Sequence, residues 1–272
     1  MPRPVSALTI AGSDSGGGAG IQADLKTFAA HRVHGLSAIA ALTAQHTRGV
    51  TAVHVPPIEF LRAQIDACFD DFDIRTVKFG MLATRDVIET AADAVATYRA
   101  PKYVLDPVMV ATSGAKLLAD DALQALRDRL LPMADIVTPN LPEAELLLGT
   151  SIDDLDAMRA ACVELSNLGA KAVLLKGGHL ASGDTVTDLF ALREGDAVTL
   201  HAIHHPRLAV NAHGTGCTLA AAIAANLARG ATLRDACVAA SDYIHRALRG
   251  GGRPGRSDLL VLDHFGAAPA SA

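Results

Sequence analysis

The sequence predicts an α/β protein in which helices cover both faces of a mostly parallel sheet. Short apolar runs alternate with helical stretches along most of the 272 residues, which is the pattern of repeated strand–helix units. Half of the residues are hydrophobic and 19% are charged, so the chain has ample apolar material for a large core. No repeat, long linker or low-complexity block interrupts residues 5–249. We therefore expect a single domain that spans residues 1–272.

Short apolar runs are expected to form the buried strands of this sheet. Continuous runs of this length, bounded by other patterns, are typical of strands that are covered on both faces. These runs are Val5–Ala11, Leu36–Ala44, Thr76–Phe79, Tyr103–Leu105, Asp135–Thr138 and Ala172–Leu175.

Helices are expected between these strands. In one of them the apolar residues Ile58, Leu61, Ile65 and Cys68 recur every three or four positions, which is helical spacing. The helical stretches in this part of the chain are Ala19–Ala30, Ile58–Phe69, Arg85–Tyr98, Asp121–Leu131 and Leu155–Leu168.

The pattern changes in the last third of the chain. Val186–Leu192 and Ala197–Ile203 flank a short polar turn, which predicts a β-hairpin. Two helices, Thr215–Arg229 and Leu233–Arg249, then close the fold. The run Gly250–Gly255 breaks the helical pattern. We expect an ordered core of about residues 5–249 and a loosely tied tail over residues 250–272.

Composition excludes several classes of partner. The net charge is −5, no block of Lys and Arg occurs and aromatic residues make up 4%, which argues against nucleic acid. The longest apolar stretch, Leu219–Ala225, is far shorter than the roughly 20 residues of a membrane span. The N-terminus lacks the apolar core of a signal peptide. The four cysteines lie far apart without a CxxC pair, which favours reduced thiols in the cytoplasm.

The first candidate site is the glycine-rich segment Gly12–Gly20, between the first strand and the first helix. Glycines let a backbone approach a ligand closely, and a helix start offers unpaired N–H groups to an anion. The alternative is a turn that needs glycine only for its backbone geometry. Gly18–Ala23 also matches the dinucleotide pattern G-x-G-x-x-A, but Gln45 and His46 stand where that fold needs an acidic residue. An NAD-dependent oxidoreductase is therefore disfavoured.

The second candidate site is Gly214-Thr215-Gly216-Cys217, at the start of a helix. N–H groups that converge at a helix start, together with the helix dipole, favour negative charge there. Such a nest stabilises the charge that develops on a phosphoryl group during its transfer. A cysteine at this position is expected to have a lowered pKa. The alternative is that Cys217 is a small buried filler.

Four further polar residues stand at the expected carboxyl ends of strands, where ligands of parallel sheets gather. Asn140 and Glu143 begin a helix, where they are expected either to hold hydrated Mg²⁺ with phosphates or to cap the helix. Asp106 and Lys176 each end a strand. They suit a metal and a phosphate respectively, although either residue alone would also be an ordinary solvated side chain.

Seven segments in order resemble the hydroxymethylpyrimidine/phosphomethylpyrimidine kinase family of the ribokinase-like superfamily. The resemblance covers about residues 6–249, and each motif is weak by itself. The segments are Ala11–Asp14 with Gly16–Thr27, Ala41–Gln45, Lys78–Leu82, Leu105–Met109, Pro139–Ala144, Leu175–His179 and His213–Thr218.

The resemblance implies a ribokinase-like three-layer sandwich that uses ATP and Mg²⁺. Members of the family phosphorylate 4-amino-5-hydroxymethyl-2-methylpyrimidine (HMP) and then its monophosphate, which gives the pyrophosphate used to build thiamine. The resemblance implies that Gln45 contacts the polar edge of the pyrimidine, since a carboxamide both donates and accepts. It places Met81 and Val108 on the faces of the ring, with Gly12 and Ala19 approaching by their backbone. Core packing is the alternative role for Met81 and Val108.

The resemblance also implies roles for the phosphate end of the site. Gly214, Thr215 and Gly216 would form an anion hole. Cys217 would assist deprotonation of the substrate hydroxyl, either as a thiolate base or by positioning.

By the same resemblance, Asn140 and Glu143 would belong to the Mg²⁺–phosphate site. Lys176 would neutralise ATP phosphates, and Asp106 would lie near the metal. A homodimer in the cytoplasm is implied as well. Two other functions stay open, a pyridoxal kinase on the same fold and a non-catalytic pyrimidine sensor. The chain departs from the family at Gly250–Asp258, which replaces a glycine- and histidine-rich stretch, although His264 and Phe265 remain.

Overall fold

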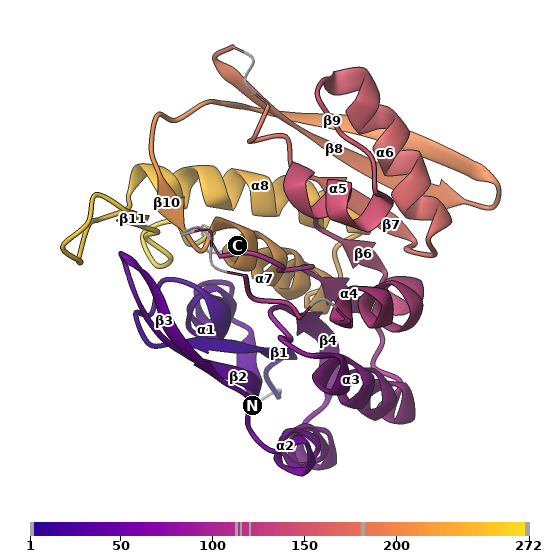
Figure 1. Cartoon of the computed structure of the whole chain (residues 1–272), viewed down its shortest axis with the longest axis vertical. Coiled ribbons are helices and arrows are strands. Elements are labelled where there is room, and N and C mark those ends of the chain that lie inside the picture. Colours follow the sequence, from indigo (N-terminus) through magenta and orange to yellow (C-terminus); the bar gives the residue numbers. More distant parts are fainter. Residues whose placement is uncertain (1–2, 112–113, 115, 120, 181–182, 270–272) are drawn as a thin grey trace.

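A nine-stranded sheet runs through the whole molecule in a computed structural model, which describes residues 3–111, 114, 116–119, 121–180 and 183–269. Its strand order is β3-β2-β1-β4-β5-β6-β7-β8-β9 (Figure 1). The strands from β2 to β7 in this order pair in parallel, whereas β3, β8 and β9 pair antiparallel at the two edges. The predicted mostly parallel sheet is confirmed.

The strands of this sheet include every buried run predicted from the sequence. Their bounds are β1 Ser6–Asp14, β2 His34–His46, β3 Gly49–His54, β4 Ile74–Phe79, β5 Tyr103–Leu105, β6 Ile136–Val137, β7 Ala172–Leu175, β8 Thr185–Glu194 and β9 Ala197–Pro206. A separate parallel pair joins β10 Ala212–His213 to β11 Leu260–Val261.

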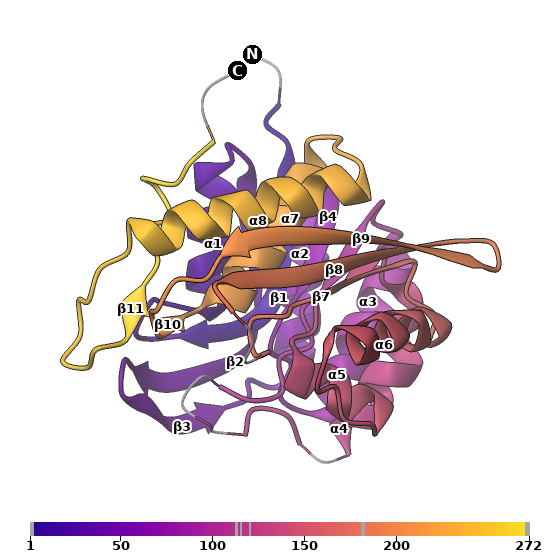
Figure 2. The same cartoon turned by 90° about the horizontal axis from the view of Figure 1, so that it is seen from above.

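Helices lie on both faces of the sheet, which gives the predicted three layers (Figure 2). One face is covered by α1 Gly20–Ala30, α7 Thr215–Ala228 and α8 Leu233–Arg249, whose buried residues form one hydrophobic cluster with the sheet. The other face belongs to a second cluster. Its helices are α2 Ile58–Asp71, α3 Arg85–Tyr98, α4 Ala122–Ala125 with the helical turns η1 Leu126–Leu130 and η2 Leu131–Met133, α5 Leu141–Leu148 and α6 Leu155–Asn167.

Helix α7 explains part of the high alanine content. It packs against β1, β4 and β5 of the sheet and also against α1 and α8. Every residue from Leu219 to Ala225 is at most 5% exposed, so this helix is buried all round. Small side chains on a fully buried helix let neighbouring backbones approach closely at the density of a protein interior. This packing brings the start of α7 to the carboxyl ends of the central strands.

Strand β3 was not predicted, and its composition explains why. Residues 51–54 of β3 are all exposed, and the strand is held by antiparallel pairing with the end of β2. An exposed edge strand buries little apolar surface, so it carries no continuous apolar run. The two-residue strands β10 and β11 were not predicted either. They are too short to show a pattern, and their pairing joins residues that are far apart in the chain.

The expectation of a loosely tied tail over residues 250–272 is wrong for the described part, residues 250–269. Leu260, Leu262, His264 and Ala267 are each at most 5% exposed. The His264 ring is 3.1 Å from the hydroxyl of Thr218 in α7, and its carbonyl accepts a hydrogen bond of 2.8 Å from Tyr243 in α8. Alternate apolar residues after the glycines thus dock this segment beside α7 and α8.

No helix in the described part of the chain is long and apolar enough to cross a membrane.

Candidate active site

A cavity of about 780 Å³ opens where the parallel strands end and α7 begins. Parallel strands bring their carboxyl ends to one edge of a sheet, and this edge is where α/β proteins bind ligands. The cavity brings together every site residue that the sequence singled out. These are Gly12, Ala19, Gln45, Met81, Asp106, Val108, Asn140, Glu143, Lys176, Gly214, Thr215, Gly216 and Cys217.

The start of α7 forms the centre of the cavity. Gly214 precedes the helix with a φ of +78°, and a Cβ atom there would lie 1.9 Å from the carbonyl oxygen of Gly18. Only glycine fits both that backbone conformation and that close approach. The helical ladder begins with the N–H of Thr218, which donates to the carbonyl of Gly214 at 2.9 Å. The N–H groups of the preceding turn therefore have no acceptor within the helix and are available to an anion.

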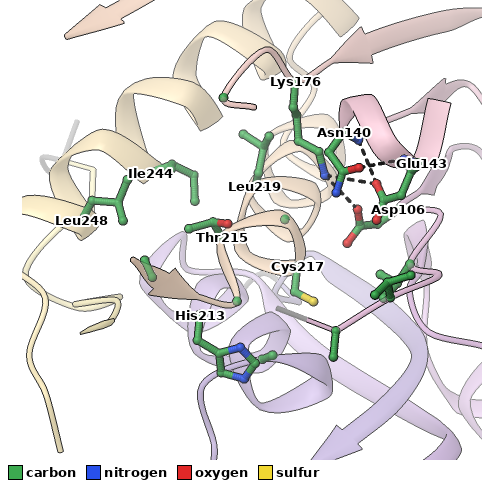
Figure 3. A pocket seen from close by; sticks show the side chains of 18 of the residues that line it. Asp106, Asn140, Glu143, Lys176, His213, Thr215, Cys217, Leu219, Ile244 and Leu248 are labelled. Atoms are coloured by element: carbon green, nitrogen blue, oxygen red, sulfur yellow. Dashed lines mark hydrogen bonds and ion pairs between the residues drawn. The ribbon is translucent and has the colours of Figure 1, made fainter. Parts of the chain in front are cut away.

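A compact polar cluster lies on one side of the α7 start (Figure 3). The ammonium of Lys176 is 3.4 Å from Oδ1 of Asp106 and 3.9 Å from Oε2 of Glu143. A methyl group on Gly216 would lie 3.1 Å from Nζ of Lys176, so this charge is adjacent to the helix start. Thr138 donates to Oδ1 of Asp106 at 3.3 Å. The ends of β5, β6 and β7 thus contribute one carboxylate, one helix cap and one ammonium to the same place.

Asn140 and Glu143 form the helix cap that was one of their two predicted roles. Oδ1 of Asn140 accepts from the N–H of Glu143 at 2.9 Å, and Oε2 of Glu143 accepts from the N–H of Asn140 at 2.8 Å. This reciprocal capping box fixes the start of α5 directly after β6. Both side chains are held rigidly at the wall of the cavity, so capping is compatible with a second role toward a ligand.

The electrostatics of the cluster follow from its burial. Burial raises the pKa of Glu143 to about 7, although Lys176 opposes this shift. Burial alone would lower the pKa of Lys176, but Asp106 and Glu143 together raise it above its ordinary value. Lys176 is therefore positively charged at neutral pH. Oδ2 of Asp106 is buried and has no hydrogen-bond partner within the described part of the chain.

The donor set fits a magnesium ion that is held mainly by phosphates and water. No group of three or more His, Cys, Asp or Glu residues suited to a metal occurs among the described residues. Mg²⁺ is commonly held by one or two carboxylates together with substrate phosphates, so a full cage of protein ligands is not required. The orphaned Oδ2 of Asp106 and the neighbouring carboxylate of Glu143 provide such a pair.

The expectation of a lowered pKa for Cys217 is wrong in this structure. Burial raises the pKa of its thiol to about 12, Lys78 lowers it in part, and Asp106 and Asp24 raise it further. The helix start was visible in the sequence, whereas the burial of the sulfur and its acidic neighbours were not. A thiol with this raised pKa is neutral at neutral pH.

The other end of the cavity is small and largely apolar. Met81 is 7% exposed and belongs to a small cluster with Ala41 and Ala83, against which Val108 packs. The position that a Cβ of Gly12 would take lies 2.9 Å from Sδ of Met81. Met81 and Val108 therefore both pack against neighbours and line the cavity, so core packing is compatible with a contact to a ligand.

Three N–H groups of the glycine-rich segment Gly12–Gly20 are taken by a carboxylate of the chain itself, so they are not available to an anion as expected. The N–H of Gly16 donates to Oδ1 of Asp14 at 2.7 Å. Those of Gly18 and Ala19 donate to Oδ2 of Asp14 at 3.0 and 2.9 Å. Burial alone would raise the pKa of Asp14, but hydrogen bonds from His213, Gly16 and Ala19 hold it below its ordinary value. An internal carboxylate thus occupies the nest that the sequence assigned to a ligand.

Sequence reasoning missed a fully buried ion pair below the α7 start. Nζ of Lys78 lies 3.0 and 2.9 Å from the two carboxylate oxygens of Asp24, and both side chains are 0% exposed. Thr9 donates a further hydrogen bond of 2.6 Å to Asp24. Burial alone would lower the pKa of Lys78, but Asp24, Cys217 and Asp106 raise it, so the lysine stays charged. Lys78 lies within Lys78–Leu82, one of the seven segments that carry the family resemblance, but nothing in the sequence shows that Asp24 is its partner.

An apolar wall on the far side of α7 also escaped prediction. Leu219, Ile244 and Leu248 line the cavity there, opposite the polar cluster (Figure 3). Ser241 lies beside them with a buried hydroxyl that has no partner in the described residues. These side chains come from α7 and α8, whose packing the sequence did not reveal. The cavity therefore has an apolar wall on α7 and α8, a polar cluster beside the α7 start (Figure 3) and a largely apolar end lined by Met81 and Val108.

Relatives of known function share most of this chain. The family described as phosphomethylpyrimidine kinase matches residues 14–261. The hydroxymethylpyrimidine/phosphomethylpyrimidine kinase of Rhizobium meliloti is 53% identical over 244 residues, which cover 89% of this chain and 90% of that protein. The thiamine biosynthesis bifunctional protein ThiED of Geobacter sulfurreducens is 50% identical over 245 residues. Those residues cover 90% of this chain but 49% of the Geobacter protein, so this chain spans about half of it.

Solved structures show the same architecture. Phosphomethylpyrimidine kinase from Clostridium difficile has a TM-score of 0.78 and 40% identity, covering 89% of this chain and 99% of its own. Pyridoxal kinase from Bacillus subtilis, in complex with ADP, has a TM-score of 0.86 and 34% identity, covering 96% and 98% of the two chains. The resemblance and the kinase function predicted from the motifs are thereby confirmed. The chain belongs to the phosphomethylpyrimidine kinase family.

Proposed function

We propose that this chain transfers the γ-phosphoryl group of ATP to the hydroxymethyl group of HMP and then to HMP phosphate. The product is the pyrophosphate used in thiamine biosynthesis. The observation that carries this proposal is the position of the α7 start within the cavity of about 780 Å³. It lies between the end lined by Met81 and Val108 and the wall lined by Leu219, Ile244 and Leu248 (Figure 3). Membership of the family supports the same activity.

The end of the cavity lined by Met81 and Val108, the heterocycle compartment, suits a small aminopyrimidine. Met81 and Val108 contact the two faces of the ring, and the backbone of Gly12 and Ala19 closes the compartment. Gln45 is the polar group at its edge, where its carboxamide donates to a ring nitrogen and accepts from an exocyclic amine. A few placed polar groups in an otherwise apolar pocket are the usual means of orienting a small ligand.

The central site binds the phosphates. The N–H groups of Thr215 and Gly216 stabilise the negative charge of the transferring group, aided by the dipole of α7. Lys176 neutralises the phosphates of ATP from the adjacent strand end, and Asn140 orients them. Phosphoryl transfer needs little covalent work from the protein, so positioning and charge neutralisation provide most of the catalysis.

Asp106 and Glu143 are the residues that would hold Mg²⁺. Their carboxylates share one wall of the cavity with Lys176. When bound with ATP, the ion would supply further neutralisation of phosphate charge. Binding of a cation beside Glu143 favours its ionised form, so the raised pKa of this carboxyl is expected to fall in the complex.

Cys217 positions the substrate hydroxyl and does not act as a preformed thiolate base. Burial raises the pKa of the thiol to about 12, so almost none of it is ionised at neutral pH. As the new oxygen–phosphorus bond forms and the bond to ADP breaks, the hydroxyl proton passes to an oxygen of the transferred phosphoryl group, and the nearby charge of Lys78 stabilises the negative charge that develops. Adenine packs against Leu219, Ile244 and Leu248, with the hydroxyl of Ser241, which has no hydrogen-bond partner among the described residues, at its polar edge.

A pyridoxal kinase is the second candidate activity, because a solved pyridoxal kinase shares this architecture over nearly the whole chain. An ADP-release assay with HMP, HMP phosphate and pyridoxal separates the two activities. We expect turnover of both pyrimidines, and turnover of pyridoxal alone would refute the proposal. Calorimetry that detects HMP binding without any ADP release in the presence of ATP and Mg²⁺ would instead indicate a sensor.

We further propose that the chain is a homodimer in the cytoplasm, as the family resemblance implies. Light scattering after size-exclusion chromatography measures the mass directly. A mass close to the monomer value of 28.1 kDa would refute the dimer. Fractionation of the source cells would test the location.

A further inference from the structure

His213 joins the glycine-rich loop to the polar edge of the heterocycle compartment. It precedes the α7 start at the end of β10, and its side chain lies in the cavity (Figure 3). Its Nε2 atom is 3.1 Å from Oδ2 of Asp14 and 2.9 Å from the carboxamide of Gln45. The ring is also held sterically, since a Cβ on Gly18 would lie 2.7 Å from its Cδ2 atom. One ring nitrogen therefore contacts both a carboxylate and the proposed substrate-reading side chain.

The hydrogen on this ring must be carried by Nε2. Asp14 is ionised and its Oδ2 already accepts from the N–H groups of Gly18 and Ala19, so it has no hydrogen to donate, and its contact with Nε2 is a hydrogen bond only if Nε2 carries the hydrogen. The other ring nitrogen, Nδ1, is buried and has no partner in the described part of the chain. A hydrogen on Nδ1 would leave a buried donor unpaired and would set the lone pair of Nε2 against the carboxylate, both of which are unfavourable.

The position of that hydrogen decides the orientation of the Gln45 carboxamide. With nitrogen toward His213, the carboxamide would place two donors 2.9 Å apart. The reverse orientation places the oxygen there as an acceptor. The nitrogen then lies 2.9 Å from the hydroxyl of Thr43, which itself donates to the carbonyl of Ser13 at 3.0 Å. The two ends of a carboxamide have nearly the same shape, so these hydrogen bonds determine which end is which.

We propose that His213, held by Asp14, is a positioning residue that fixes the order of acceptor and donor which Gln45 presents to the substrate. The inference rests on the proposed function, in which Gln45 contacts the pyrimidine. Gln45 keeps one free lone pair on its oxygen, on the side of His213, and one free N–H on the side of Thr43. This order matches a ring with an exocyclic amine next to an acceptor nitrogen, as in HMP. A ring with a carbonyl next to an N–H is disfavoured, because it would set its oxygen against the oxygen of Gln45 and its N–H against the N–H of Gln45.

The test measures discrimination between HMP and its 4-oxo analogue, in which the amine is replaced by a carbonyl and the adjacent ring nitrogen carries hydrogen. We compare kcat/KM for the two substrates in the wild type, His213→Leu and His213→Gln. The wild type is expected to prefer HMP by at least about 100-fold, since mismatched donors and acceptors in a buried site are strongly rejected. Leucine removes the donor and frees the Gln45 carboxamide to turn, so the preference is expected to fall at least tenfold.

His213→Gln is the matched control, because the amide nitrogen of glutamine reaches a position similar to Nε2 and can donate to both partners. It is expected to keep most of the discrimination. A His213→Leu variant that phosphorylates HMP with the wild-type discrimination would overturn the inference, as would a His213→Gln variant that loses as much discrimination as leucine. A wild type that does not phosphorylate HMP would instead refute the proposed function.

A second measurement does not depend on turnover or on how well the variants fold. Nitrogen-15 NMR of the wild type reports which ring nitrogen of His213 carries hydrogen, and the signal is assigned by its loss in His213→Gln or by sequential connectivity. We expect hydrogen on Nε2. A ring with hydrogen on Nδ1 alone would overturn the inference, whatever the activity of the enzyme.

Discussion

Replacing Lys78 by methionine should destabilise the fold strongly, because it leaves Asp24 as an uncompensated buried charge. Both side chains are 0% exposed, and Asp24 on α1 faces β1 and β4, where Thr9 and Lys78 are its only polar side-chain partners in the hydrogen bonds described. Breaking a buried pair by removing one partner costs about 3–5 kcal/mol. For a chain of this size that cost lowers Tm by on the order of 10 °C.

The same reasoning predicts a partial rescue when the second charge is removed. Lys78→Met combined with Asp24→Asn leaves no buried charge, and the asparagine still accepts the hydrogen bond of Thr9. The double variant is therefore expected to recover at least half of the lost free energy of unfolding. Asp24→Asn alone should also cost about 3–5 kcal/mol, because it leaves the buried ammonium of Lys78 unpaired. Urea unfolding followed by circular dichroism measures all four proteins. Additive losses in the double variant would refute the idea that an unpaired charge causes the instability.

Three further predictions concern the cavity. Cys217→Ala should lower kcat for HMP much more than it raises KM, which steady-state kinetics measures. An unchanged kcat would mean that Cys217 only fills space in the core. Gln45→Ala should weaken HMP binding in calorimetry and leave ATP binding intact, whereas loss of both would indicate misfolding. Burial raises the pKa of Glu143 from 4.5 to about 7, so the fold favours its protonated form and stability should decline as pH rises from about 4.5 to 7. In metal-free buffer Glu143→Gln should remove that part of the decline in Tm, and an identical pH profile would contradict it.

Most of the fold could be predicted because its strands are buried on both faces. A strand such as Ala172–Leu175 is wholly apolar and 0% exposed, so it stands out in the sequence. The exposed strand β3 and the short pair β10 and β11 have no such signal. The docked tail was missed because isolated apolar residues such as Leu262 and Ala267 are buried only in the cluster that they form with residues of α1, α7 and α8.

The candidate site was predictable as a set of positions but not as a set of interactions. Motifs placed Asp106, Asn140 and Lys176 at strand ends, and the structure brings them to one cavity. The contact between Asp14 and His213 joins residues 199 positions apart, and no local pattern reports it. The pKa of Cys217 was misjudged for a related reason. A helix start can be recognised in a sequence, whereas the desolvation of a sulfur atom depends on every element packed around it.

The two glycine-rich segments look alike in the sequence but serve different physical ends. In Gly12–Gly20 the absence of side chains lets the backbone wrap around the carboxylate of Asp14, which takes the N–H groups of Gly16 and Gly18. The carbonyl of Gly18 then lies where any side chain on Gly214 would collide with it. The first segment thus acts as a rigid support against which the second is built. Because the internal carboxylate satisfies the first nest, we expect a phosphate to bind at the N–H groups at the start of α7, beside Lys176.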